Sequence, residues 1–252
     1  MNLETLNKSI SDKLQINLYK NSDPALNGVQ VGDMKQEIKK IGLMVDASME
    51  GFKVAAKEGV DMILCHHGFF WGKPLAITNT HYKRVKFLIE NNISLFAAHL
   101  PLDANLEVGN NIGIAKKLDL ENIEPFGMYK GNFIGVQGQL KSPTPLDEIK
   151  KILVGNNEPV YIIPGGKDLV TNVAIVSGGA PEEVYEAIEK NMDLYITGDK
   201  SHEVYHTCLE NGINMISAGH YATEVYGVKQ LGEWISKKFN IETVFIDIPT
   251  GA

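Results

Sequence analysis

The sequence predicts an α/β fold made of two pseudo-repeated α/β lobes with mixed, mostly parallel sheets. Short apolar runs alternate with segments of helical periodicity along the whole chain. Alternation of this kind favours parallel strands joined by helical crossovers. A strand–helix–strand block also occurs twice, which indicates that the fold is built from two related halves.

The first half begins with a helix and then alternates between strands and helices. Leucine and isoleucine recur at helical spacing over residues 3–18, and Pro24 with Asn27-Gly28 ends that pattern. We expect strands at 28–32, 41–48, 61–67 and 93–103, the last running into a loop, and helices at 3–18, 49–60, 81–92 and 110–120, followed by the turn-rich segment 129–132.

The second half repeats this alternation and closes with a helix and a strand. The intermediate segments are 147–155, 160–166, 171–180, 181–191, 192–199, 202–212 and 213–224. The final helix is expected at 226–239 and the final strand at 242–250. We therefore predict a first lobe at 1–125 and a second at 126–252, with the C-terminal segment packing back on the first lobe.

The internal repeat aligns residues 41–68 with residues 173–200 without a gap. Asp61 then falls on Asp193, and His66-His67 fall on Gly198-Asp199. The alignment continues from 87–103 to 207–224 with one inserted residue, so both copies end in strand–His–x–x–x–acid. Two unrelated βαβ units would share the strand and helix pattern, but the repeated ending is a more specific feature.

Composition limits the classes of function. The chain has 252 residues, 44% of them hydrophobic and 22% charged, which is typical of a globular protein. It contains no run of eighteen apolar residues and no signal peptide at residues 1–14, so we expect a cytoplasmic protein with no membrane partner. The two cysteines, Cys65 and Cys208, favour a reduced compartment. A net charge of −7 argues against nucleic acid as the partner.

Histidines and acids gather where predicted strands end. In parallel α/β sheets the functional groups lie at the carboxyl ends of the strands. The candidates at such ends are His66, His67, Asp103, His220 and Glu224. Imidazole and carboxylate suit divalent zinc, iron, manganese or nickel, and five such groups exceed what one tetrahedral zinc needs.

The adjacent pair His66-His67 suggests two ions instead of one. Neighbouring residues of an extended segment project in different directions, so each histidine serves its own ion more easily than both chelate one. A carboxylate would then bridge the two ions. A single histidine at a strand end is more often a hydrogen-bonded structural residue, and it is the joint occurrence that favours metal. Cys65 is expected to pack as a small hydrophobe and not to act as a nucleophile.

The chain also resembles a known family. The segments NGVQVG, ILCHHGFFW, HLPLDANLEVGNN, YITGD, GHYATE and FIDIP occur in this order and spacing in the Nif-three-like dinuclear metal-centre family, whose members are often labelled GTP cyclohydrolase I type 2 homologs. The resemblance runs nearly end to end and is to the short bacterial or archaeal form. It implies two intertwined α/β lobes, a dinuclear metal site and a ring-shaped homohexamer.

The resemblance also assigns roles to residues. It implies His66, His67, Asp103, His220 and Glu224 as ligands of two divalent ions, with Asp103 and Glu224 as the bridges. The roles of four further residues stay open, since each could either surround the metal ligands or contact substrate: His99, His206, Phe70 and Trp71. We favour a role for His99 in orienting a ligand. Phe69, Phe70 and Trp71 would either form a stacking wall for a ring-shaped substrate or pack an interface.

The leading hypothesis for function is a dinuclear metal-dependent hydrolase acting on a small molecule. Opening of a purine ring, as by a GTP cyclohydrolase, and hydrolysis of a phosphoester would both suit such a site. The alternative is a non-catalytic metal-binding or adaptor protein that forms a ring-shaped oligomer. No catalytic residue beyond the metal ligands is identified by the sequence, and the substrate stays open.

Overall fold

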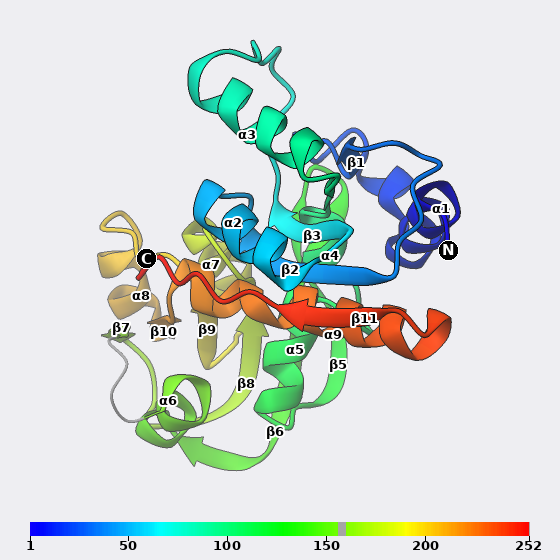
Figure 1. Ribbon diagram of the computed structural model, residues 1–252. Helices are drawn as coiled ribbons and strands as arrows, with labels where there is room; N and C mark the ends of the chain where they lie inside the picture. Colours follow the sequence, from blue (N-terminus) through cyan, green and yellow to red (C-terminus); the bar gives the residue numbers. More distant parts are fainter. Residues whose placement is uncertain (156–159, 252) are drawn as a thin grey trace. The chain divides into compact units, whose positions relative to one another are not determined.

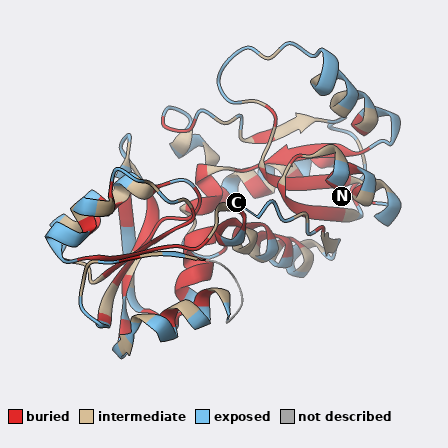
Figure 2. Cartoon of the chain, turned by 90° about the vertical axis from the view of Figure 1, so that its left-hand side faces the viewer, coloured by how far each residue is buried: buried red, intermediate tan, exposed pale blue. Residues whose placement is uncertain are grey.

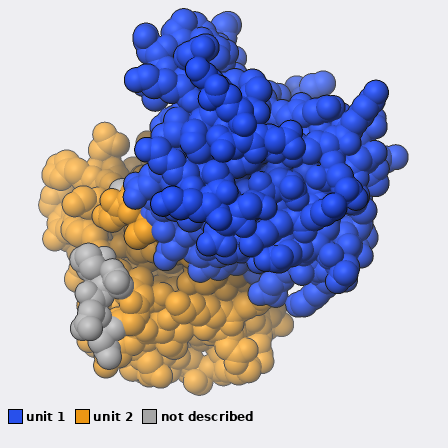
Figure 3. Space-filling view, in the orientation of Figure 1, with its two compact units in different colours: residues 1–102, 227–248 blue, residues 103–226, 249–252 orange. Residues whose placement is uncertain are grey.

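The structure, a computed structural model, describes residues 1–155 and 160–251 (Figure 1). The chain divides into two compact units, and neither is a continuous segment (Figure 3). Unit 1 contains residues 1–102 and 227–248, and unit 2 contains residues 103–226 and 249–252. The chain therefore enters unit 2 just before Asp103 and leaves it just after Tyr226.

Unit 1 is built on a five-stranded sheet of order β1-β4-β3-β2-β11. All neighbouring pairs are parallel except β1 with β4. The strands are β1 (Gly28–Val31), β2 (Lys40–Asp46), β3 (Met62–His67), β4 (Ser94–Ala97) and β11 (Glu242–Phe245). The central strands are buried almost throughout, which explains why they appear in the sequence as continuous apolar runs.

The helices of unit 1 have clear end signals. Asn2 caps the first helix by accepting a hydrogen bond from the Thr5 N–H, and Gly59 ends the second in the left-handed conformation. The predicted helix at 3–18 is shorter in the structure, because Gln15 adopts a left-handed φ of 51°. The helices are α1 (Leu3–Leu14), η1 (Ile16–Tyr19), α2 (Met49–Glu58), α3 (Asn79–Glu90), α4 (Leu100–Asp103) and α9 (His220–Phe239), of which α4 and α9 continue into unit 2.

Unit 2 is built on a six-stranded sheet of order β5-β6-β8-β9-β10-β7. The three strands β8, β9 and β10 are parallel, and the remaining pairs are antiparallel. The strands are β5 (Glu121–Tyr129), β6 (Asn132–Pro145), β7 (Tyr161–Pro164), β8 (Leu169–Ile175), β9 (Leu194–Thr197) and β10 (Asn214–Ser217). The predicted α/β class with mixed sheets is therefore confirmed.

The core of unit 2 lies between its sheet and its helices. Leu118, Val136, Val173, Ile196 and Ile216 are among its buried members. Within each unit the central strands are mostly buried, whereas the edge strands and the outer faces of the helices are more exposed (Figure 2). The helices that unit 2 adds are α5 (Asn110–Lys117), α6 (Leu146–Val154), η2 (Pro181–Glu183), α7 (Val184–Glu189) and α8 (Tyr205–Asn211). Among the described residues, no helix has the length and apolar character needed to cross a membrane.

The internal repeat is present in the strand register. In unit 1, Ile41 pairs with Met62, and Met62 pairs with Ser94. The residues aligned with them in unit 2 pair in the same way, since Val173 pairs with Leu194 and Leu194 pairs with Asn214. The two units therefore share one β–α–β–α–β frame.

Two aligned aspartates hold this frame by the same hydrogen bonds. Asp61 Oδ2 accepts from the backbone N–H groups of residues 39 and 40, at 2.8 and 2.9 Å. Asp193 Oδ2 accepts from the N–H groups of residues 171 and 172, at 3.0 and 2.9 Å. Each carboxylate, directly before one parallel strand, thus binds the backbone of the neighbouring strand.

The β5–β6 hairpin was missed by the sequence-based prediction, which identified only its turn. Lys130 and Gly131 form the two-residue turn with φ of 46° and 86°. Gly135 lies so close to the neighbouring strand that an added Cβ would overlap the carbonyl oxygen of Ile175. Glycines that permit close strand packing look like loop residues in a sequence, and this hid a strand of 14 residues.

Candidate functional site

A histidine cluster lies in unit 1 at the carboxyl end of β3. His66 and His67 are the last two residues of that strand, and Asp46, at the end of the parallel neighbour β2, pairs with His67 in register. The two imidazole rings are 4.6 Å apart between centroids and tilted by 47°. His66 is fully buried, whereas His67 is partly exposed.

The Nδ1 atoms of this pair are held by oxygen acceptors. His66 Nδ1 lies 2.8 Å from the carbonyl oxygen of Ala98, and His67 Nδ1 lies 2.8 Å from Asp46 Oδ1. A carbonyl oxygen only accepts hydrogen bonds, so Nδ1 of His66 carries the proton. The lone pair of the neutral imidazole is then on Nε2. This is the arrangement in which proteins orient histidine as a metal ligand.

His99 completes the histidine cluster. Its Nδ1 lies 2.9 Å from Asp23 Oδ1, and its ring centroid is 5.2 Å from that of His66. His66, His67 and His99 each offer a ligand atom within 4.8 Å of the others, so these three residues could hold a metal ion. The structure therefore places His99 beside the predicted ligand pair.

Asp23 is a buried carboxylate with several donors. Its side chain is fully buried and also accepts hydrogen bonds from Asn27 Nδ2 and from the backbone N–H groups of Ala25 and Leu100. Desolvation raises the pKa of Asp23. The hydrogen bond and charge of His99 lower it, as do the hydrogen bonds from Asn27 and Ala25, and together they leave the pKa below its ordinary value. Asp23 is thus kept ionised to hold His99.

The aromatic segment after β3 divides between the core and the cluster. Phe69 is buried and packs edge-on against Phe52, so it belongs to the core of unit 1, and Phe70 is half-buried beside it. Trp71 is 38% exposed, and its ring centroid lies 5.0 Å from that of His99 and 5.8 Å from that of His67. Of the three aromatics, Trp71 is the one that contacts the histidine cluster.

Cys65 precedes the histidine pair and is fully buried within β3. Burial, together with the charge of Asp46, raises the pKa of its thiol. A thiol held in this protonated state is a poor nucleophile. The side chain packs with the hydrophobic core of unit 1.

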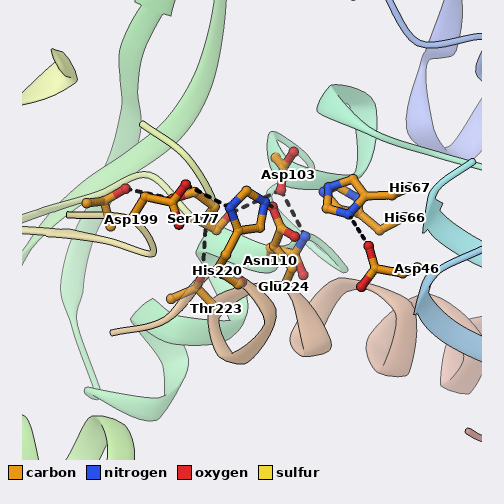
Figure 4. Close-up of polar contacts among 12 residues, drawn as sticks. Asp46, His66, His67, Asp103, Asn110, Ser177, Asp199, His220, Thr223 and Glu224 are labelled. Carbon is orange, nitrogen blue, oxygen red and sulfur yellow. Dashed lines mark hydrogen bonds and ion pairs between the residues drawn. The ribbon is translucent and has the colours of Figure 1, made fainter. Parts of the chain in front are cut away.

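A carboxylate cluster lies in unit 2 and contains Asp103, His220 and Glu224 (Figure 4). Asp103 and Glu224 are 6% and 3% exposed, and each offers a carboxylate oxygen within 4.8 Å of the other. Asp103 Oδ1 accepts hydrogen bonds from Asn110 Nδ2 at 2.8 Å and Ser177 Oγ at 2.9 Å. Buried carboxylates held together by neutral donors are suited to a cation.

His220 and Glu224 lie four residues apart in the first turns of α9, which places them on one face of the helix. His220 Nε2 is 3.3 Å from Glu224 Oε1, and His220 Nδ1 is 3.0 Å from Asp199 Oδ2. The hydrogen bond to Glu224 is the largest influence on His220 and raises the pKa of its imidazole to about 9. Desolvation acts in the opposite direction, but the charge of Glu224 and the contact with Asp199 outweigh it. Without a metal, this imidazole takes up a proton.

A glycine turn after β8 leaves room for the carboxylate cluster. Gly178 has a φ of +67°, and an added Cβ would overlap Glu224 Oε1. Its carbonyl oxygen accepts hydrogen bonds from the N–H groups of Gly198 and Asp199 at 2.9 and 3.0 Å. The turn therefore packs on Glu224 and positions Asp199, the partner of His220.

The remaining predicted histidine does not join these clusters. His206 is exposed on α8, where its ring contacts Tyr205. No described contact links it to Asp103, His220 or Glu224. Its suggested approach to the site thus stays a prediction.

Sequence reasoning missed the residues that orient the candidate ligands. Asp46 ends β2 and Asp199 follows β9, so the same argument from strand ends could have identified both. Ser177 follows β8 at the same spacing, but a serine is not a metal-ligand type and was passed over, and Asp23 carries no such signal. Asp23 reaches His99 across 76 residues of sequence, and Ser177 reaches Asp103 across 74.

Comparison with known proteins gives consistent matches along the chain. The family model described as Duf34/NIF3 (NGG1p interacting factor 3) matches residues 1–251. A protein from Archaeoglobus fulgidus is 43% identical over 99% of both chains, and one from Pyrococcus abyssi is 40% identical over 100% of both. Both relatives are named GTP cyclohydrolase 1 type 2 homolog.

Solved structures give the same result. The crystal structure of TTHA1606 from Thermus thermophilus is similar with a TM-score of 0.90 at 36% identity, over 100% of both chains. Reduced HcgD from Methanocaldococcus jannaschii is similar with a TM-score of 0.84 at 30% identity, over 98% of both chains.

Proposed function

Because the chain belongs to the Duf34/NIF3 family, we propose that it is a dinuclear metal-dependent hydrolase whose ligands are His66, His67, Asp103, His220 and Glu224. The names of its relatives favour a reaction of the GTP cyclohydrolase type, and hydrolysis of a phosphoester is the other reaction of this class that we propose to test. The ions would be zinc, iron, manganese or nickel.

The support for metal binding is the way the histidines are anchored. In each unit an oxygen acceptor engages Nδ1 of the candidate ligand: the carbonyl of Ala98 for His66, Asp46 for His67 and Asp199 for His220. This leaves Nε2 as the ligand atom in all three. A core histidine would satisfy its polar atoms without such a repeated pattern, whereas metal ligands are held this way in most metalloproteins.

The carboxylates of unit 2 fit the role of bridges. Two divalent ions a few ångströms apart repel each other, and shared negative charge offsets that repulsion. Asp103 and Glu224 are buried, and their carboxylate oxygens are close together. In the proposed site Asp103 and Glu224 would therefore be shared by both ions, and each histidine would serve one ion.

The donor set suits hydrolysis. Divalent ions held by imidazole and carboxylate supply Lewis-acid chemistry, by acidifying water and polarising an electrophile. The chain's own residues would fix the ligands and shape the approach of the substrate. Trp71, exposed and against His67 and His99, is the side chain that we propose contacts a ring-shaped substrate.

The test is metal content together with activity. Protein loaded with zinc, iron, manganese or nickel and dialysed exhaustively should retain about two ions per chain by elemental analysis. It should then hydrolyse at least one member of a panel of nucleotides, phosphodiesters and cyclic amides. A chain that retains no transition metal would overturn the proposal.

The second candidate function is a non-catalytic metal-binding or adaptor protein. The family description, NGG1p interacting factor 3, names an interaction partner and no reaction, and this favours it. Tight retention of metal with no turnover across the whole panel would support this function over hydrolysis.

We also propose that the chain forms a homo-oligomer, expected to be a hexamer. Large apolar side chains are exposed on the segment from the end of β3 through α3: Trp71, Ile77, Tyr82 and Ile89 are 38%, 41%, 53% and 65% exposed. A second copy of the chain would cover such a surface. Light scattering tests this, and a monomer mass of 27.8 kDa would contradict it.

A further inference from the structure

Unit 1 contains a hollow beside the histidine cluster to which the metal chemistry assigns no role. It lies between α1, η1 and β1 and has a volume of about 480 Å³. Most of the segment NGVQVG, which helps to carry the family resemblance, lines it. Volumes of about 300–1,000 Å³ are typical of sites for small molecules.

The lining has a distinctive chemistry. Five neutral side chains with hydrogen-bonding groups line the hollow: Asn7, Ser11, Asn17, Asn27 and Gln30. The described residues that line it include no charged and no aromatic side chain. The absence of cations from this lining argues against a phosphate.

Amide side chains match one class of ligand well. Asparagine presents a donor and an acceptor side by side, and this edge is complementary to the edges of nucleobases. Asn7 and Asn17 are the lining residues placed to offer it. The amide of Asn27 is bonded to His99 and Asp23, and the amide of Gln30 is bonded to Leu26 and Phe69. The three apolar lining side chains would contact the faces of a planar ring. Gly28 has a φ of +111°, and a Cβ added there would come 3.6 Å from Asn7 Oδ1, so its lack of a side chain keeps the hollow open.

One lining residue connects the hollow to the histidine cluster. Asn27 Oδ1 accepts the backbone N–H of His99 at 2.7 Å, and Asn27 Nδ2 donates to Asp23 Oδ2 at 2.8 Å. Asp23 in turn holds the His99 ring through its other oxygen. A ligand that contacts Asn27 would therefore touch the residue that binds both the backbone N–H of His99 and the carboxylate of Asp23.

We propose that this hollow is a binding site for a nucleobase presented as a nucleoside. The site lies wholly within unit 1, and nucleoside binding there does not depend on bound metal. It therefore stands apart from the proposed hydrolase function, and either can fail without the other.

The test is titration calorimetry of the metal-stripped protein with guanosine, adenosine, cytidine and uridine, and with ribose and glucose as the carbohydrate arm. At least one nucleoside should bind with a Kd below about 1 mM, and neither sugar should bind at that concentration. When the nucleoside saturates the protein, the NMR signals of His99 should shift, because Asn27 lines the hollow and is hydrogen-bonded to His99. No nucleoside binding, binding of the sugars alone, or unchanged His99 signals would overturn the proposal.

Matched serine variants on α1 locate the site. Ser11→Leu fills the hollow and should weaken nucleoside binding by about tenfold or more. Ser9→Leu makes the same change on α1 outside the lining and should leave the affinity unchanged. Asn17→Ala, at an exposed position, gives a second lining variant if Ser11→Leu fails to fold. Equal affinity in the lining variants and the control would overturn the assignment.

Discussion

The two units share a frame but carry different chemistry at the ends of aligned strands. In unit 1, β3 ends in His66-His67, and in unit 2 the aligned positions after β9 are Gly198-Asp199. Unit 1 thus supplies imidazoles, whereas the buried candidate ligands of unit 2 are mainly carboxylates. The register and the aligned aspartates are unchanged, so the difference lies in the strand ends alone.

The carboxylate that anchors a histidine comes from a different strand of the repeat in each unit. In unit 1 the carboxylate that holds a histidine, Asp46, ends the first strand of the repeat. The residue aligned with it in unit 2 is Gly178, and the carboxylate that holds His220 is instead Asp199, after the next strand. Gly178 leaves space that Glu224 occupies. One frame therefore supports two different sets of candidate ligands through a few exchanged residues.

The largest expected effect is a loss of metal, and it tests whether the carboxylates are shared by two ions while each histidine serves one. Asp103→Ala or Glu224→Ala should reduce the metal content from about two ions per chain to well below one, because both ions lose a shared charge. His66→Ala should retain about one ion, because it serves a single ion. Elemental analysis after dialysis measures the content, with circular dichroism as the test of folding.

Glu148→Ala is the control for those variants, because it removes an exposed carboxylate on α6 of the same unit. It should leave the metal content unchanged. A wild type that binds one ion, lost equally in the Asp103, Glu224 and His66 variants, would replace the dinuclear proposal with a mononuclear site.

The next effect concerns the glycine that replaces Asp46 in the repeat. Gly178→Ala strains a backbone with a φ of +67° and also overlaps Glu224. Gly59→Ala has the same φ but no atom within 4 Å of the added Cβ. We expect about 1 kcal/mol of destabilisation for Gly59→Ala and about 3 kcal/mol for Gly178→Ala. Thermal unfolding measures both, and equal shifts would contradict the proposed contact with Glu224.

The shared frame predicts equal effects at its two aligned aspartates. Asp61→Ala and Asp193→Ala each remove a carboxylate that accepts two backbone hydrogen bonds, and each should cost about 2 kcal/mol of unfolding free energy. Asp12→Ala, an exposed residue of α1, should cost almost nothing. Denaturant unfolding of the three variants compares them. A loss of stability in only one of the two variants would show that the aligned aspartates do not contribute equally to the two units.

Much of this frame could be predicted from sequence because it depends on local signals. Buried parallel strands such as β3 appear as apolar runs, and the gapless alignment of 41–68 with 173–200 matches the register of the strands. The His-x3-acid ending was also visible, and for His220 and Glu224 it corresponds to one face of a helix. The family resemblance identified from the sequence is confirmed by the match over residues 1–251.

The parts that escaped prediction depend on contacts between distant residues. The β5–β6 hairpin was missed because Pro125, Gly135 and Gly138 weaken the strand pattern, although close packing explains the two glycines. Asp23 was missed because its role depends on meeting His99, and no local pattern indicates that contact. Sequence patterns thus identified candidate ligands better than the residues that orient them.

The smallest effect separates the two carboxylates that act on His220. In chelator-treated protein, NMR titration should give a pKa of about 9 for this imidazole, because its protonated form donates to Glu224 and to Asp199. Glu224→Gln should lower that pKa more than Asp199→Asn, since Glu224 makes the larger contribution. The folded pKa lies above the ordinary value of 6.5, so the resulting stability is fully present below about pH 6.5 and is lost as the pH rises through about 9. A midpoint near the ordinary value in the metal-free protein would show that neither carboxylate holds the ring in solution.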